Sequence, residues 1–173
     1  MRYHNITHDD MLNGEGLRTV LWVAGCSHHC KGCQNPITWN PQGGLPFDKT
    51  VERELWHWID MDYCSGLTLS GGDPMYPGNR EDIHLLCRRF KKRYPDKTIW
   101  MYTGYTMNQI KDEPVLDYVD VVVDGKYIES LRDITRHWCG STNQVVWRKT
   151  ADGWKPDKPE STEEHAPESC GCG

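Results

Sequence analysis

The sequence predicts an α/β fold in which a parallel sheet with flanking helices forms an open, partial (β/α) barrel. Two observations predict this class. Short apolar, β-branched segments alternate with segments whose apolar residues recur at helical spacing, a pattern typical of βα units and a parallel sheet. Only four or five such strands are present, which is too few to close a barrel of eight and therefore favours an open one.

The predicted strands are short segments rich in apolar and β-branched residues. They are residues 18–24, 67–70, 98–103, 118–123 and 144–147. The segment 34–49 contains three prolines and two glycines and is interpreted as a loop. Residues 106–111 predict a short helix that ends before Pro114, because proline disrupts a helix interior.

Two longer helices are predicted between the strands. In the first, Val51, Leu55 and Ile59 recur at helical spacing and form an apolar face. The second has Asn79 as its expected N-cap and apolar residues at helical spacing over 83–94. Each helix therefore has one side suited to packing on the sheet.

The chain of 173 residues is expected to form one domain followed by a tail. Residues 1–150 carry all the predicted strands and helices. Residues 151–173 are acidic, rich in proline and nearly devoid of apolar residues, so they cannot offset the entropy lost on ordering. We expect a flexible acidic tail with Pro, Gly and Cys, in which Cys170 and Cys172 are incidental thiols.

Charge and composition exclude several classes of function. The net charge of −5 gives no electrostatic reason to expect direct nucleic-acid binding. No apolar run approaches the roughly 20 residues that span a bilayer, and the polar N-terminus lacks a signal-peptide core. We therefore expect a cytoplasmic protein without a membrane partner. Eight cysteines in that compartment favour metal or redox chemistry over disulfides.

Three of these cysteines follow the first predicted strand directly. Cys26, Cys30 and Cys33 have the spacing C-x3-C-x2-C. Thiolates bind zinc or iron–sulfur clusters. A structural zinc site would need a fourth ligand, for which His28 and His29 are candidates. A [4Fe-4S] cluster would instead use three thiolates and leave one iron open to an outside ligand.

Other motifs also follow predicted strands. Ser70–Pro74 reads SGGDP, and Thr103-Gly104 and Asp124-Gly125 end two further strands. These segments are either plain turns or places where the backbone approaches a ligand closely, which glycine permits. Because the carboxyl ends of parallel strands meet at one edge, we expect these motifs and the cysteines to form one composite site.

The cysteine spacing and the GGDP segment together resemble the radical S-adenosylmethionine (radical-SAM) superfamily, in which a GGEP-type motif receives the ammonium group of SAM. Further motifs resemble, in order, the family of activating proteins of anaerobic (class III) ribonucleoside-triphosphate reductases. These are residues 13–18 (a G-x-G-x-R element), 33–36, 70–74, 99–105, 122–126, 129–133 and 140–144. The resemblance extends over about residues 3–148.

The resemblance implies a partial barrel of the radical-SAM type and a set of site residues. Cys26, Cys30 and Cys33 would bind a [4Fe-4S] cluster, Gly32, Cys33 and Gln34 would contact SAM, and Gly71 and Gly72 would hold its methionine end. Asp73 replaces the glutamate of the motif, so either its carboxylate or only its backbone would contact SAM. Asp124 would lie near the SAM carboxylate, although a turn-forming Asp-Gly explains it equally well.

The resemblance also implies the reaction and the partners. Reductive cleavage of SAM at the cluster would produce a 5′-deoxyadenosyl radical, which abstracts hydrogen from a glycine of the reductase. Flavodoxin or ferredoxin would be the electron donor. Cys139 occupies a position where the family has a basic residue. Two alternatives stay open: an activase of a different glycyl-radical enzyme, and a zinc-binding interaction module.

Overall fold

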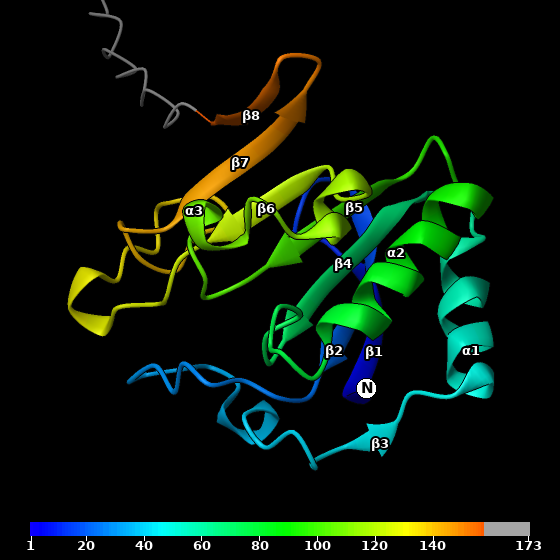
Figure 1. Cartoon of the computed structure of the whole chain (residues 1–173), viewed down its shortest axis with the longest axis horizontal. Helices are drawn as coiled ribbons and strands as arrows, with labels where there is room; N and C mark the ends of the chain where they lie inside the picture. Colours follow the sequence, from blue (N-terminus) through cyan, green and yellow to red (C-terminus); the bar gives the residue numbers. More distant parts are fainter. Residues whose placement is uncertain (158–173) are drawn as a thin grey trace, which may run out of the picture.

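The structure, a computed structural model, describes residues 1–157 and contains one eight-stranded sheet (Figure 1). The strands are β1 (Arg2–Asp10), β2 (Leu17–Val23), β3 (Leu45–Pro46), β4 (Cys64–Gly71), β5 (Thr98–Tyr102), β6 (Val121–Asp124), β7 (Val145–Thr150) and β8 (Gly153–Pro156). The α-helices are α1 (Lys49–Ile59), α2 (Arg80–Arg93) and α3 (Met107–Ile110). The 3-10 helices are η1 (Pro36–Thr38), η2 (Pro114–Asp117) and η3 (Glu129–Leu131).

The sheet is mixed rather than purely parallel. Its order is β3-β1-β2-β4-β5-β6-β7-β8, and the central strands β2, β4, β5 and β6 are parallel neighbours. On one side β1 and β3 add in antiparallel orientation, and on the other side β7 and β8 do the same. The expected α/β class is confirmed, and the expected parallel sheet is confirmed for its centre only.

Helices α1 and α2 pack against one face of the sheet (Figure 1). Successive strand residues point to opposite faces. In β4, Leu67 and Leu69 are fully buried in the core that also contains Leu55 of α1 and Ile83 of α2. The apolar faces predicted for this strand and for the two helices therefore pack together in one core.

The opposite face holds a buried cation from the G-x-G-x-R element. The guanidinium of Arg18 donates to Thr68 Oγ1 at 2.7 Å and to the carbonyl oxygens of Leu67 and Thr98 at 2.8 Å each. Burial lowers the pKa of Arg18 to about 10. Arg18 therefore links β2 to β4 and β5, and this element has an architectural role.

The ordered sheet extends past the boundary expected at residue 150. Strand β8 lies within the segment assigned to the tail and pairs with β7. The remainder of the predicted tail, including Cys170 and Cys172, lies outside the described residues. Across residues 1–157 every helix is too short or too polar to span a bilayer.

Candidate functional site

A cavity of about 560 Å³ lies where the predicted motifs meet, at the carboxyl ends of the parallel strands. Its lining includes the three clustered cysteines, Gln34, Gly71, Gly72, Asp73, Thr103, Gly104 and Gly125. The expectation of one composite site is thus met in its geometry, since segments from four strand ends share a single cavity.

The cysteine loop begins directly after β2. The N–H of Cys26 donates to the carbonyl of Trp39 at 3.1 Å, and the N–H of Cys33 donates to the carbonyl of Cys30 at 3.1 Å. All three thiols are partly exposed to the cavity. Burial raises the pKa of the Cys26 and Cys30 thiols, which bind metal only as thiolates.

The donor set fits an iron–sulfur cluster in its chemistry. Cysteine thiolates are the ligands that such clusters use, and this loop supplies three cysteines. Within residues 1–157, no three His, Cys, Asp or Glu side chains lie close enough to hold a single metal ion. A cluster, unlike a single ion, takes each thiolate on a different iron.

The two glycines of the SGGDP segment are needed because protein backbone approaches them. The N–H of Gly72 donates to the carbonyl of Val23 at 2.8 Å, and a Cβ on Gly72 would lie 2.5 Å from the carbonyl oxygen of Gly25. Gly71 has φ +101°, and its Cβ would lie 2.8 Å from the nitrogen of Val23. These contacts hold the segment against the end of β2, and both glycines also line the cavity.

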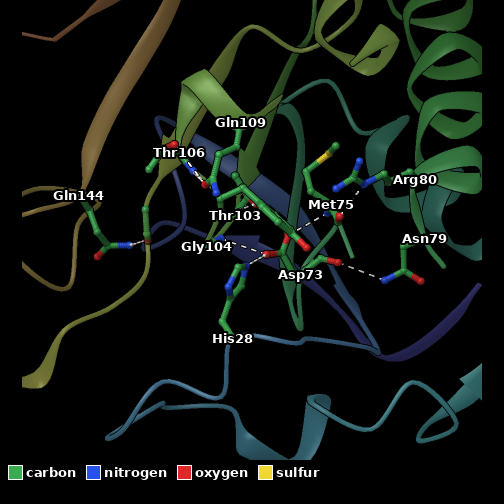
Figure 2. A network of polar contacts seen from close by, with 12 residues as sticks. His28, Asp73, Met75, Asn79, Arg80, Thr103, Gly104, Thr106, Gln109 and Gln144 are labelled. Carbon is green, nitrogen blue, oxygen red and sulfur yellow. Dashed lines mark hydrogen bonds and ion pairs between the residues drawn. The ribbon is translucent and has the colours of Figure 1, made fainter. Parts of the chain in front are cut away.

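Asp73 is buried, with 1% of its surface exposed, and its carboxylate has four protein donors (Figure 2). Oδ1 accepts from Thr103 Oγ1 and from the N–H of Met75, both at 2.8 Å. Oδ2 accepts from His28 Nε2 at 2.8 Å and from the N–H of Gly104 at 3.0 Å. The carboxylate thus joins the loops that follow β2, β4 and β5, and both of its oxygens are engaged by protein donors.

Asn79 is the N-cap residue of α2, as expected, but its side chain makes no cap hydrogen bond. Instead Nδ2 donates to the carbonyl of Ala24 at 2.8 Å. It also donates to the carbonyl of Asp73 at 3.1 Å (Figure 2). The expected N-cap position is confirmed, and the buried amide fastens the SGGDP segment to the end of β2.

Asp124 and Gly32 are the two predicted site residues that do not line the cavity. The carboxylate of Asp124 accepts from the N–H of Met107 at the start of α3, and burial raises its pKa. Gly32 is exposed, has φ +74°, and its Cβ would lie 2.9 Å from Glu129 Oε1. The side chain of Asp124 therefore supports α3, and its expected place near the SAM carboxylate stays a prediction.

Sequence reasoning missed several lining residues. Tyr102 has a buried hydroxyl without a hydrogen-bond partner among residues 1–157, and burial raises its pKa. A buried polar atom without a partner needs an explanation, and this one belongs to a residue of the cavity wall. Cys139, noted only as a departure from the family pattern, is also buried in this wall. The sequence could not predict the position of Tyr102, because a tyrosine in an apolar strand segment looks like an ordinary core residue.

A family model and several curated relatives match most of this chain. A family model described as a 4Fe-4S single cluster domain matches residues 12–147. A relative from Enterobacteria phage T4 is 46% identical over 91% of this chain and 100% of its own length. Relatives from Vibrio cholerae (42% identical, 87% of this chain, 99% of the relative) and Escherichia coli K12 (40%, 84% and 97%) are also similar. All three are named anaerobic ribonucleoside-triphosphate reductase-activating protein.

Proposed function

The chain belongs to the family of anaerobic ribonucleoside-triphosphate reductase-activating proteins, and we propose that it activates such a reductase by generating a glycyl radical in it. The observation that carries this proposal is the shared cavity, which the C-x3-C-x2-C cysteines and the Gly71-Gly72 segment both line. A cluster held by these cysteines would pass one electron from an external reductant to the sulfonium of SAM, which would give methionine and a 5′-deoxyadenosyl radical. The radical would take a hydrogen atom from a glycine Cα of the reductase and leave as 5′-deoxyadenosine.

Cys26, Cys30 and Cys33 would hold three irons of a [4Fe-4S] cluster, which leaves the fourth iron for the amine and carboxylate of SAM. The matching 4Fe-4S family model supports the cluster. The partial exposure of all three thiols to one cavity supports the same ligand set. The open sheet with its site at the strand ends is consistent with a partial barrel of the radical-SAM type.

SAM would lie along the remaining wall of the cavity. The backbone of Gly71 and Gly72 would receive its methionine end, and Gln34 would contact it from the cysteine loop, with Gly32 at the exposed rim of that loop. The orphaned hydroxyl of Tyr102 supports a polar ligand in this wall. These groups bind and orient the cofactor.

The surroundings of the cavity suit a macromolecular substrate. Six exposed apolar side chains are lining residues or lie within two positions of one along the chain: Met11, Leu12, Ile37, Ile128, Leu131 and Ile134. Exposed apolar groups close to a site are typical of protein contact surfaces. The reductase would be the partner, with flavodoxin or ferredoxin as electron donor in the cytoplasm.

The two alternatives have less support. An activase of a different glycyl-radical enzyme would use the same site, but all three relatives described above carry the reductase activator's name. A zinc-binding module would need a fourth ligand, yet among residues 1–157 no three His, Cys, Asp or Glu side chains lie close enough to hold a single ion. The module would also have no use for the Gly71-Gly72 wall.

Cleavage of SAM tests the proposed chemistry. Full-length protein purified anaerobically, reduced with dithionite and given SAM is expected to form 5′-deoxyadenosine. Cys30→Ala is expected to abolish the product, because one cluster ligand is lost. Undiminished cleavage by this variant, or colourless wild-type protein carrying one zinc, would overturn the cluster assignment.

A further inference from the structure

The side chain of His28 is buried, although it belongs to the cysteine loop, where its neighbours are exposed. His28 lies midway between Cys26 and Cys30, and its side chain is only 8% exposed. Its neighbours Ser27, His29 and Lys31 are exposed. Because an ionised carboxylate only accepts hydrogen bonds, the 2.8 Å contact is made by His28 Nε2–H donating to Asp73 Oδ2 (Figure 2).

The ring occupies a socket built by the loop after β5. A Cβ on Gly104 would lie 2.3 Å from His28 Cδ2, so any other residue at 104 would displace the ring. The ring of Tyr105 packs against His28 with centroids 4.6 Å apart at 71°. The N–H of Gly104 donates to the same Asp73 oxygen as His28, at 3.0 Å. Shape and hydrogen bonding therefore both select a histidine ring here.

The Asp73 carboxylate is also held through its second oxygen, Oδ1. Asp73 Oδ1 accepts from Thr103 Oγ1 and from the N–H of Met75, so its orientation does not depend on His28. The N–H of Asp73 donates to the carbonyl of Gly25, immediately before Cys26. The cysteine loop is thus attached to Asp73 at two points. The Asp73 N–H holds the backbone just before Cys26, and the Asp73 carboxylate holds His28 in the middle of the loop.

We infer that His28 is a positioning residue: docked against Asp73 in the Gly104–Tyr105 socket, it holds the C-x3-C-x2-C loop in its metal-binding shape before any cluster is present. This inference rests on the proposed role of the three cysteines. By this inference, the Asp73 carboxylate fixes the conformation of the cysteine loop through its hydrogen bond with His28. It also links that loop to the Gly71-Gly72 wall, since Asp73 follows those glycines directly in the chain.

Hydrogen exchange of full-length, cluster-free protein tests the inference without any catalytic readout. His28→Phe keeps a ring but removes the donor, and Gly104→Ala leaves His28 and Asp73 intact but fills the socket. Both are expected to speed amide exchange in residues 26–33 by about ten- to a hundredfold, because a hydrogen bond to a charged group is lost. His28→Gln, which keeps a donor, is expected to restore part of the protection.

His29→Asn is the matched control. It lies in the same loop, has φ 47°, a conformation that asparagine also tolerates, and its ring is outside the socket. Its exchange is expected to equal that of the wild type. Exchange in His28→Phe within twofold of wild type, or an equal acceleration in His29→Asn, would overturn the inference.

Iron release from the reconstituted full-length protein gives a second readout. Transfer of iron to a chelator is expected to be about tenfold faster in His28→Phe and Gly104→Ala than in wild type or His29→Asn. Equal release rates would contradict the inference and leave the proposed function intact. Conversely, if the variants differ from wild type as expected but the wild-type protein forms no glycyl radical, only the proposed function is contradicted.

Discussion

The N–H of Met107 donates a 2.6 Å hydrogen bond to Oδ2 of Asp124, which joins the end of β6 to the first residue of α3. Asp124 is buried, so its carboxylate is held away from water while it accepts this bond. An Asp-Gly pair at a strand end looks the same in sequence whether it binds a ligand or supports a neighbouring turn. Here the neighbouring helix takes the carboxylate.

Asp124 gives the folding stability a defined pH dependence. Burial raises its pKa in the folded state above the ordinary value of 3.8. The folded state therefore binds this proton at higher pH than the unfolded state does, and the associated stabilisation is complete below about 3.8 and lost as pH rises through the folded pKa. We expect the free energy of unfolding of wild type to rise relative to Asp124→Asn as pH falls from about 7 to 4.

Urea denaturation of cluster-free protein at several pH values measures this difference. Asparagine keeps an oxygen that can accept from Met107, so the variant removes the titration more than the contact. The exposed Asp117→Asn is the control. A difference that stays flat or falls toward acid pH would contradict the assignment.

Arg18→Met is expected to destabilise the fold by about 2–5 kcal/mol. The change removes a buried cation that bonds to Thr68 and to the carbonyls of Leu67 and Thr98, and leaves these acceptors in a dry environment. Urea denaturation measures the loss, with the exposed Arg53→Met as control. A loss no larger than that of the control would mean that the G-x-G-x-R element is not architectural.

Tyr102→Phe is expected to separate cofactor binding from stability. The hydroxyl has no partner among residues 1–157, so its removal should leave the free energy of unfolding unchanged or higher. The affinity for SAM should fall about five- to tenfold, the worth of one hydrogen bond. Calorimetric titration measures affinity, and the exposed Tyr63→Phe is the control. Unchanged affinity would remove Tyr102 from the proposed site.

Serine at any one of the three clustered cysteines is expected to bring the iron content close to background. Cys64→Ser is the matched control, because Cys64 is buried at the start of β4, away from the cavity lining. It should retain iron near the wild-type level of about four per chain. Retention of a full cluster by two of the three variants would show that the ligand set is wrong.

The central strands, α1 and α2 could be predicted because their patterns are strong. Leu67 and Leu69 alternate with Thr68 as a sheet residue should, and Leu55 and Ile59 share a buried helix face. The edges could not be predicted in the same way. Strand β1 is RYHNITHDD, mostly polar and partly exposed, and it is recognisable only through its pairing with β2.

The position of the site could be predicted from the strand ends, but the hydrogen-bond partners of its individual side chains could not. Asp73 lies in the segment that the sequence predicts to bind SAM, yet its carboxylate accepts hydrogen bonds from four protein donors in three separate loops. Asn79 has an ideal N-cap identity, yet its amide bonds to Ala24 and Asp73. Such partners lie far apart in sequence and meet only in the fold.

The most direct test of the account is the EPR spectrum of a class III reductase mixed anaerobically with this protein, SAM and dithionite. The account predicts a glycyl-radical doublet that requires the intact C-x3-C-x2-C loop and disappears with Cys30→Ala. No doublet from the reductase under conditions in which a different glycyl-radical enzyme gives one would contradict the proposed partner. A doublet of full intensity with Cys30→Ala would contradict the role of the cysteine cluster itself.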